Sequence, residues 1–203
     1  MDIGKKGIDF ICAWETGGRR YYERVYKSTF IWPGLSSGPT IAIGVDCGFY
    51  KKEELTAMFE KYVSSDELKL IHGAIRQTGQ KGRAYTKKLK GIVVTWDESL
   101  EIFSDFTLPK FEALAENTFP GVGELCASAQ IAMLSLVFNR GSSLVGSRRA
   151  EMAKIKKLVP KKDYKSIAAE FRSMKRLWAE NKNSDSDLTD RREAEAKLVE
   201  SCL

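Results

Sequence analysis

The sequence predicts an α+β protein, mostly α-helical, in which a small β-containing lobe and a larger helical lobe flank a cleft. Three observations support this. Apolar residues recur at helical spacing over residues 1–15, glycine and proline concentrate in residues 16–50, and helical spacing returns over residues 51–203. We therefore expect a single domain, residues 1–203, made of a first helix, the β-containing lobe and the helical lobe in that order.

The β-containing lobe has its strongest strand signal in PTIAIGVDCGFY, residues 39–50. With the two-residue period of a strand, one face is apolar: Ile41, Ile43 and Val45. The other face is polar at its ends and nearly bare between: Thr40, Ala42, Gly44 and Asp46. Six extended residues span about 20 Å, too far for both polar side chains to serve one bond. We therefore expect the chain to bend at Gly44 or Gly48.

The helical lobe opens with recognisable helix starts. Apolar residues over 55–63 follow the i, i+3, i+4, i+7, i+8 spacing of one buried helix face. Ser64 with Glu67, and Thr95 with Glu98, match the capping box, in which two side chains satisfy backbone N–H groups at a helix start.

Later helices follow from composition. Residues 124–139 are apolar nearly all round, which is typical of a central buried helix, and Gly141 is placed to end it. Pro109 must interrupt or kink the helix that begins near residue 95. Further helices are expected near residues 147–159, 164–178 and 188–200.

Basic residues outnumber acidic ones and give the 203-residue chain a net charge of +6. Lysine and arginine gather at 87–90, 148–149, 154–157 and 161–162. Such clusters suit a polyanionic partner, whether nucleic acid or an acidic envelope polymer, although solvated helix faces are the preferred explanation of any single cluster. No run approaches the ~20 apolar residues of a membrane helix, so we expect no membrane insertion.

The start of the chain lacks the apolar core and cleavage site of a signal peptide. We therefore expect synthesis in the cytoplasm, with other means of delivery if the protein acts elsewhere.

The cysteines, Cys12, Cys47, Cys126 and Cys202, show no CxxC spacing, and His72 is the single histidine. A zinc site is therefore not expected, and we predict neither a metal nor an organic cofactor. The expectation is buried thiols in a reducing compartment, with a Cys12–Cys47 bridge as the unsupported alternative.

Glu15 is the first candidate for chemistry, because it closes an apolar helix stripe just before the glycine-rich ETGGRR. A carboxylate against apolar neighbours loses hydration, which raises its pKa and suits it to donate a proton. The alternative interpretation is a polar helix end that pairs with Arg19 or Arg20.

Asp46 is the candidate partner, since no acidic residue lies between Glu23 and Asp46; Glu23 is the weaker alternative. Two carboxylates in different environments are the machinery of glycoside hydrolysis, in which one protonates the leaving oxygen and the other serves water or the sugar carbon. The small residues between Thr40 and Asp46 leave room for a sugar ring near the backbone.

These motifs resemble those of the phage-type lysozymes (muramidases), in which a helix ending in a glutamate leads into a β-lobe with a TIGxG-like segment. Here that segment is TIAIG, residues 40–44. LSLVFNRG at 134–141 is similar to the family's central-helix ending, and RRAEM at 148–152 and LTDRREAEAKL at 188–198 are similar to its late helices. The resemblance covers nearly the whole chain and implies a lysozyme-like fold.

The chain also departs from this family, because the uncharged PGLSSGP stands where typical members carry the catalytic aspartate. The order Thr40 then Asp46 instead resembles the pesticin-like muramidase domain of the same superfamily. That resemblance implies that Glu15 is the general acid, Asp46 the base or second carboxylate, and Thr40 a holder of the attacking water. It also implies inversion, which a carboxyl separation of about 6.5–9.5 Å would support, whereas about 5–5.5 Å favours retention.

Other polar and aromatic residues are secondary candidates. Gly44 would leave space for substrate, and three aromatic side chains could stack on sugar rings, although aromatics more often belong to the core: Trp32, Phe49 and Tyr50. Asn139 could contact sugar but more simply satisfies backbone groups. We expect a packed or hydrogen-bonded His72, and an ion-pair network on one helix face formed by Arg191, Arg192 and Glu195.

The leading functional interpretation is a muramidase that hydrolyses the β-1,4 bond between N-acetylmuramic acid and N-acetylglucosamine, as a phage endolysin or an antibacterial toxin. Its partner is then the glycan strand of bacterial peptidoglycan, with an immunity or inhibitor protein as a second partner in the toxin case. We expect a monomer that binds no nucleic acid and acts on the cell wall, in the periplasm. The alternatives are a non-catalytic basic module that binds glycan or nucleic acid, and a chitosanase- or chitinase-like glycosidase of the same fold.

Overall fold

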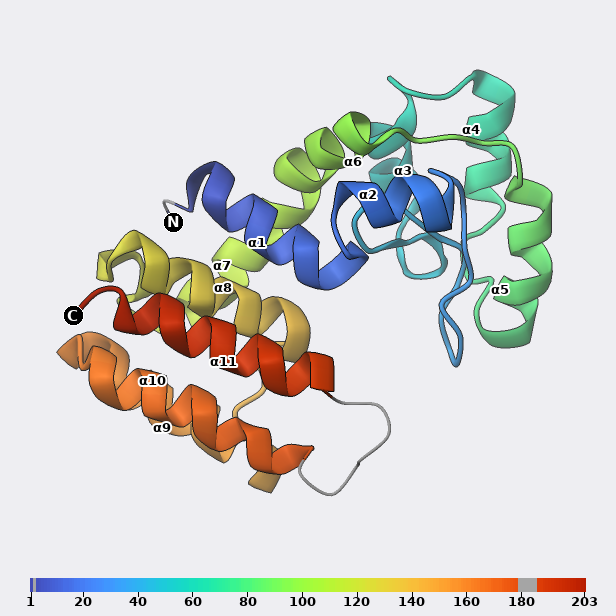
Figure 1. Ribbon diagram of the computed structural model, residues 1–203. Coiled ribbons are helices and arrows are strands. Elements are labelled where there is room, and N and C mark those ends of the chain that lie inside the picture. The colour runs from blue at the N-terminus through green and yellow to red at the C-terminus, as the bar shows by residue number, and fades with distance from the viewer. Residues whose placement is uncertain (2, 179–185) are drawn as a thin grey trace. The chain divides into compact units, whose positions relative to one another are not determined.

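The computed structural model describes residues 1, 3–178 and 186–203, and this part of the chain is mostly helical with a single two-stranded antiparallel sheet (Figure 1). The expected α+β, mostly α class is confirmed at this level. The α-helices and strands are α1 (Gly4–Thr16), α2 (Arg19–Tyr21), β1 (Thr40–Ile41), β2 (Val45–Asp46), α3 (Lys52–Phe59), α4 (Ser65–His72), α5 (Gly79–Thr86), α6 (Trp96–Ile102), α7 (Leu108–Thr118), α8 (Ala127–Arg140), α9 (Ala150–Leu158), α10 (Tyr164–Ser173) and α11 (Ser186–Glu200).

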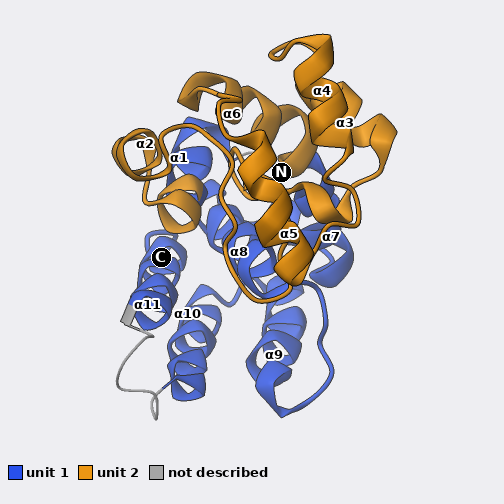
Figure 2. Ribbon diagram, turned by 90° about the vertical axis from the view of Figure 1, so that its right-hand side faces the viewer, with its two compact units in different colours: residues 1–11, 109–203 blue, residues 12–108 orange. Residues whose placement is uncertain are grey.

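The chain divides into two compact units (Figure 2). The hairpin unit comprises residues 12–108, and the helical unit comprises residues 1–11 and 109–203. The expected lobe boundary at residue 50 is therefore not where the chain divides. The reason is that the sheet is too small to bury its own apolar face, and it shares a core with helices that follow it in sequence.

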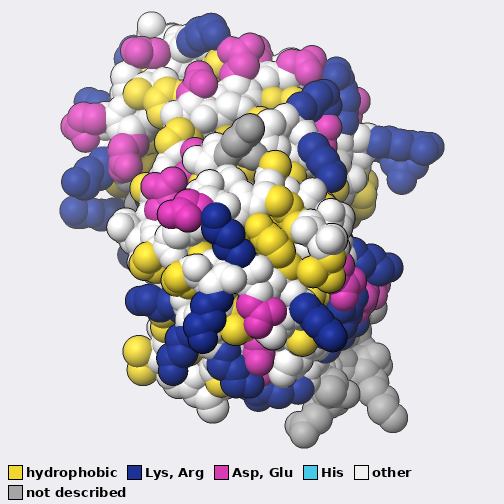
Figure 3. Space-filling model, turned by 90° about the vertical axis from the view of Figure 1, so that its left-hand side faces the viewer, with side chains coloured by type: hydrophobic (Ala, Val, Ile, Leu, Met, Phe, Trp, Pro, Cys, Tyr) yellow, Lys and Arg dark blue, Asp and Glu magenta, His cyan; other side chains and the backbone are white. Residues whose placement is uncertain are grey.

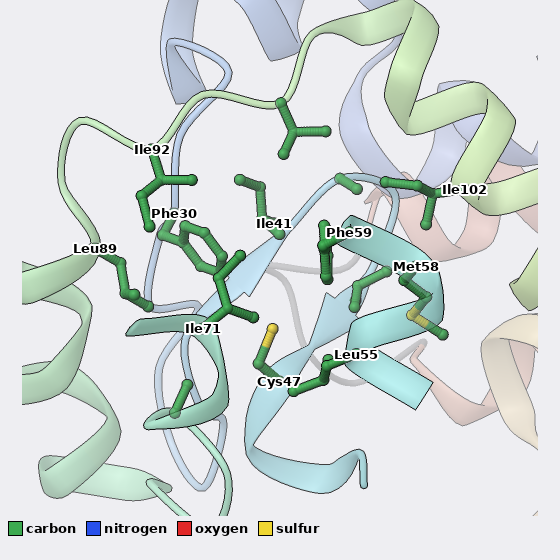
Figure 4. Close-up of a cluster of buried hydrophobic side chains, with 14 residues drawn as sticks. Phe30, Ile41, Cys47, Leu55, Met58, Phe59, Ile71, Leu89, Ile92 and Ile102 are labelled. Carbon is green, nitrogen blue, oxygen red and sulfur yellow. The ribbon is translucent and has the colours of Figure 1, made fainter. Parts of the chain in front are cut away.

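The core of the hairpin unit joins side chains from the sheet region to side chains from α3, α4 and α6. Ile41 and Cys47 pack with Leu55, Phe59 and Ile71, and all are almost fully buried (Figure 4). Burying one such large side chain stabilises a fold by roughly 1.5–3 kcal/mol. The apolar side chains of the stripe predicted over residues 55–63 pack against this core, but the helix ends at Phe59, so the predicted helical spacing does not continue over residues 60–63.

The predicted single strand is a hairpin instead. Thr40 pairs with Asp46 and Ile41 with Val45, and the three residues between them form the turn. Ala42 and Gly44 have φ angles of 54° and 77° in the left-handed region, which glycine adopts readily. The bend expected at Gly44 is confirmed. Ala42, expected on the open face, is buried, because the turn rotates it towards the core.

The expectation of loops and short strands over residues 16–50 is also partly wrong, because α2 and a π-helical turn over Tyr22–Tyr26 lie within it. Tertiary contacts explain this local helix. Tyr22 is 1% exposed. Its hydroxyl donates to the carbonyl oxygen of Val94 at 2.9 Å and accepts from Ser99 Oγ at 3.0 Å. Burial of one tyrosine ring thus holds the turn.

The helix starts predicted from capping boxes are confirmed. Ser64 Oγ accepts from the N–H of Glu67 at 3.3 Å, while Glu67 Oε2 accepts from the N–H of Ser64 at 2.8 Å. Thr95 and Glu98 make the equivalent pair of hydrogen bonds. Each box satisfies backbone N–H groups that have no partner within the helix.

Pro109 is the second residue of α7, and it marks the interruption expected there. α6 ends at Ile102, and a π-helical turn over Phe103–Thr107 leads to α7. The N–H of Leu108 bonds to the carbonyl oxygen of Phe103, one residue further back than in an α-helix. Proline cannot donate to the preceding turn, so a widened turn before it is a common accommodation.

The helical unit is organised around α8. Its residues from Ala129 to Val137 are all buried, and Gly141 ends the helix with a φ angle of 70°, as predicted. α11 packs against both α8 and α10, and α10 packs against α9 (Figure 1).

A disulfide between Cys126 and Cys202 closes this unit across 76 residues of sequence. The expectation of thiols is therefore wrong for these two cysteines, whose spacing in sequence gave no signal for a pairing. Cys12 and Cys47 are buried thiols and form no bridge with each other. Burial, followed by the charge of Asp46, raises the pKa of the Cys47 thiol.

The surface carries charges of both signs. On the face shown in Figure 3, lysine and arginine side chains are interspersed with aspartate and glutamate. Across the part of the chain that the structure describes, no helix has the length and apolar character needed to cross a membrane.

The Arg191–Arg192–Glu195 network exists, but it is buried and does not face solvent. Glu195 Oε1 accepts from Ser135 Oγ at 2.6 Å and from Arg192 Nη2 at 2.9 Å. Arg191 Nε donates to Ser135 Oγ at 3.1 Å. Burial raises the pKa of Glu195, although both guanidinium groups act in the opposite direction. One carboxylate therefore joins α11 to α8.

We predict that Glu195→Ala lowers the free energy of unfolding by about 3–5 kcal/mol, because it leaves buried guanidinium groups without their carboxylate. Asp190→Ala removes an exposed carboxylate from the same helix and should change stability by less than about 0.5 kcal/mol. Urea unfolding followed by circular dichroism measures both. Equal losses in the two variants would show that the buried network is not the cause.

Candidate active site

A cavity of about 180 Å³ in the hairpin unit brings together three of the residues singled out in the sequence: Glu15, Thr40 and Gly44. Its remaining lining comes from the end of α1, the π-helical turn over Tyr22–Tyr26, the segment before β1 and the hairpin. These residues are Thr16, Tyr22, Tyr26, Thr29, Ile31, Pro33, Ile41 and Ala42. Asp46 is absent from this lining. The cavity thus combines an acid, a hydroxyl and an apolar wall.

Glu15 is the penultimate residue of α1 and is half-buried. The helix ends sharply after it, since Gly17 and Gly18 have φ angles of 70° and 77°. Thr16 Oγ1 donates to the carbonyl oxygen of Cys12 at 2.8 Å and accepts from the N–H of Gly18 at 3.3 Å. A Cβ at residue 17 would lie 2.9 Å from Tyr21 Cβ, so this close turn requires glycine there.

Arg19, one of the two arginines that could pair with Glu15, bonds to Glu23 and Asp97. Arg19 Nε donates to Glu23 at 2.8 Å, and its two terminal nitrogens reach Asp97 at 3.2 and 3.3 Å. Glu23, the weaker candidate for the second carboxylate, is therefore exposed, bound to Arg19 and outside the lining of the cavity.

Thr40 is held from both sides by backbone pairing. Its N–H and carbonyl oxygen bond to Ile31 at 2.8 and 2.9 Å, and β2 lies on its other side. Its hydroxyl donates to the carbonyl oxygen of Gly38 at 3.2 Å, which leaves the oxygen lone pairs to accept. The threonine is thus fixed in position while its oxygen can still accept a hydrogen bond.

Asp46 lies directly opposite Thr40 in the hairpin. The N–H of Cys47 bonds to the carbonyl oxygen of Pro39 at 2.9 Å, one residue outside this pair. The Thr40–Asp46 pair is therefore of the non-hydrogen-bonded kind, in which opposite side chains come closest, with Cβ atoms roughly 4.5–5.5 Å apart. The hairpin removes the separation that a straight strand would have imposed.

The carboxylate of Asp46 is itself tightly held. Both of its oxygens accept from the N–H of Gly38 at 3.0 Å, and Oδ1 also accepts from the N–H of Gly48 at 3.0 Å. A Cβ at residue 38 would lie 2.6 Å from Asp46 Oδ1 and 2.7 Å from the carbonyl oxygen of Gln77. Gly38, within PGLSSGP, is thus required by the close approach of this carboxylate.

Two tyrosines of the cavity were missed in the sequence, Tyr22 and Tyr26. Burial raises the pKa of both phenols. Their rings lie 6.2 Å apart, edge to face, and Tyr26 also contacts the edge of Tyr21 at 5.4 Å. The signal that could have found them is the i, i+4 spacing of Tyr22 and Tyr26 just after a helix-ending glycine pair.

The other aromatic candidates lie outside this cavity. Trp32 Nε1 donates to the carbonyl oxygen of Ser37 at 2.9 Å, and the guanidinium of Arg83 lies 5.5 Å from its ring centre. Phe49 is 68% exposed, and it lines a separate depression of about 600 Å³ together with Tyr50. Burial raises the pKa of the Tyr50 phenol.

Two further residues have contacts of their own. His72 Nε2 lies 2.9 Å from Thr56 Oγ1, and burial lowers its pKa, so the expected hydrogen-bonded role is confirmed. Asn139 belongs to the helical unit, where its Oδ1 accepts from Arg192 Nη2 at 3.3 Å and where it lines a different cavity. Groups of three or more metal-ligating side chains are absent from the described residues.

The sequence matches no protein-family model and no curated protein. The resemblance to phage-type lysozymes therefore stays a prediction from the sequence motifs.

We predict that Asp46→Ala lowers the free energy of unfolding by about 2–4 kcal/mol, because it leaves the buried N–H groups of Gly38 and Gly48 without an acceptor. Asp46→Asn keeps one acceptor oxygen of the same shape and should lose clearly less. Urea unfolding followed by tryptophan fluorescence compares the two. Equal stability of wild type and Asp46→Ala would contradict a structural role for this carboxylate.

Proposed function

We propose that this protein is a peptidoglycan muramidase that hydrolyses the β-1,4 bond between N-acetylmuramic acid and N-acetylglucosamine. The observation that carries the proposal is that Glu15 and Thr40, 25 residues apart in sequence, line one cavity. Opposite Thr40 in the hairpin stands Asp46, the second carboxylate. An acid, a hydroxyl and a carboxylate on one small scaffold are the groups that glycoside hydrolysis uses.

Glu15 acts as the general acid. It is half-buried, and its cavity has an apolar wall that includes Ile31 and Ile41. In this role its carboxyl group transfers a proton to the leaving glycosidic oxygen. The rigid helix end at Gly17 and Gly18 holds this acid in place.

Asp46 and Thr40 act together on the attacking water. Two backbone N–H groups hold the Asp46 carboxyl group in one orientation. Asp46 does not itself line the cavity, whereas Thr40, the residue opposite it in the hairpin, does. A water that donates to Thr40 Oγ1 would lie at the edge of the cavity, where Asp46 accepts its second proton. The resemblance to the pesticin-like domain implies inversion, in which water attacks the face of the sugar opposite the bond that the acid protonates.

The cavity is large enough to bind only the part of the glycan at the bond that is cleaved. Its volume of about 180 Å³ is below the roughly 300–1,000 Å³ of pockets that enclose a whole small ligand. Neighbouring sugars would therefore lie along the surface, where the exposed ring of Phe49 and the half-buried ring of Tyr26 are available for stacking. The net charge of +6 suits an acidic cell envelope. A monomeric state and an immunity protein remain predictions.

We predict that Glu15→Gln loses at least about hundredfold of the lytic activity, because the amide keeps the shape of the side chain but has no proton to transfer. Lysis of purified sacculi is followed by turbidity, with an unfolding curve to show that the variant is folded. The matched control is Glu23→Gln, which neutralises the exposed carboxylate bound to Arg19 and should lyse as wild type does. Normal lysis by Glu15→Gln would overturn the mechanism.

Mass analysis of the released muropeptides identifies the reaction. Products with N-acetylmuramic acid at the reducing end are expected of a muramidase, whereas 1,6-anhydro ends would indicate a lyase. Digestion of chitosan and chitin, without cleavage of peptidoglycan, would indicate a related glycosidase. Binding that falls steeply with salt and is indifferent to Glu15 and Asp46, with no products, would indicate a non-catalytic basic module.

We predict that Thr40→Val loses about tenfold or more of the activity while the protein stays folded, because valine has the same shape but no hydroxyl to hold water. Thr40→Ser restores the hydroxyl and should recover most of the rate. Initial rates on solubilised glycan strands measure both variants. If the valine and serine variants are equally active, the hydroxyl has no part in the reaction.

A further inference from the structure

A second cavity, of about 520 Å³, lies in the helical unit and is rich in arginine. It is formed by the end of α8, a 3₁₀ turn over Ser147–Arg149, the residue that follows a 3₁₀ turn over Met174–Leu177, and the first turn of α11. Arg140, Arg148 and Arg149 line it, and Trp178 supplies an aromatic wall. Among the residues that the structure describes, none that lines this cavity is acidic. The proposed muramidase site uses none of these residues.

Arg140 is the innermost of the three arginines. Its Nη2 donates to the carbonyl oxygen of Arg148 at 2.5 Å, and its guanidinium lies 5.3 Å from the ring centre of Trp178. Its Nε is buried and has no partner among the described residues. An unpartnered N–H on a charged group is costly, because the water that it lost is not replaced by an acceptor. A ligand with oxygen acceptors would relieve that cost.

Among the described residues, no carboxylate in the lining offsets the charge of this cluster. Burial, followed by the neighbouring charges of Arg149, Arg192 and Arg148, lowers the pKa of Arg140 to about 10. The charge of Glu151 acts in the opposite direction. Its two carboxylate oxygens are already bound by Arg176, at 2.5 and 3.1 Å. Three guanidinium groups thus share one cavity that has no carboxylate among its described lining residues.

We propose that this cavity binds a phosphoryl group. A phosphate monoester carries a charge of about −1.5 to −2 at neutral pH and offers three strong acceptor oxygens, so it offsets more of the cluster than one carboxylate would. One guanidinium group can donate two parallel hydrogen bonds to two oxygens of a phosphate. Its planar, forked arrangement of N–H groups makes arginine the preferred side chain for this contact. Ser147 adds a hydroxyl donor, and Trp178 with Leu188 gives a surface for an organic group attached to the phosphate. The proposal does not depend on the muramidase function.

Titration calorimetry with inorganic phosphate, at constant ionic strength, tests the proposal. Wild type should bind phosphate saturably at one site. Arg148→Ala with Arg149→Ala should weaken binding by about tenfold or more, because charge-assisted hydrogen bonds are lost. The matched control is Lys156→Ala with Lys157→Ala, which removes the same two charges from exposed positions on α9 and should bind as wild type does.

A second variant separates shape from charge. Arg148→Lys with Arg149→Lys keeps both charges but loses the planar fork, so phosphate should bind several-fold more weakly than in wild type. Glycerol 3-phosphate should bind at least as tightly as inorganic phosphate, and vesicles of phosphatidylglycerol test a lipid headgroup as the source of the phosphoryl group. Absence of saturable phosphate binding, or equal loss in the arginine and lysine pairs, would overturn the proposal. Binding to vesicles without saturable binding of phosphate would also overturn the proposal, since it would indicate attraction to a diffuse basic surface.

Discussion

The hairpin unit depends on one carboxylate that holds two turns together. Asp46 accepts hydrogen bonds from the N–H of Gly38, before β1, and from the N–H of Gly48, after β2. A two-stranded sheet is marginal by itself. This hairpin is stabilised because the carboxylate closes its open end and the helices behind it bury its apolar face. The position of Thr40, and with it one side of the candidate site, follows from that closure.

Asp46, which holds the hairpin together, is also the residue proposed as the second carboxylate of the site. A carboxylate held by backbone N–H groups cannot turn away, so its charge is oriented before any substrate arrives. Glu15 is oriented by different means, through a helix end that two glycines make abrupt. The two carboxylates therefore occupy contrasting environments: one is held by hydrogen bonds, and the other lies beside an apolar wall.

Charge is used differently in the helical unit. Arg191 and Arg192 form ion pairs with the buried Glu195 of the same helix. Hydrogen bonds of Glu195 and Arg191 to Ser135 join α11 to α8. Arg140, Arg148 and Arg149 line a cavity that has no carboxylate among its described lining residues. A cluster of like charges that lowers the pKa of one of its own members is unfavourable by itself. Its natural complement is an anion.

Features that depend on neighbours in sequence were determined by the sequence alone. Both capping boxes, the glycine that ends α8 and the apolar face of α3 up to Phe59 arise from contacts within a few residues, so local pattern was sufficient. Only the tertiary structure decided that Thr40 and Asp46 face each other across a hairpin, that Tyr22 folds a π-helical turn, and that Cys126 meets Cys202. These depend on contacts between distant residues, whose energy comes from burial and pairing that no local pattern encodes.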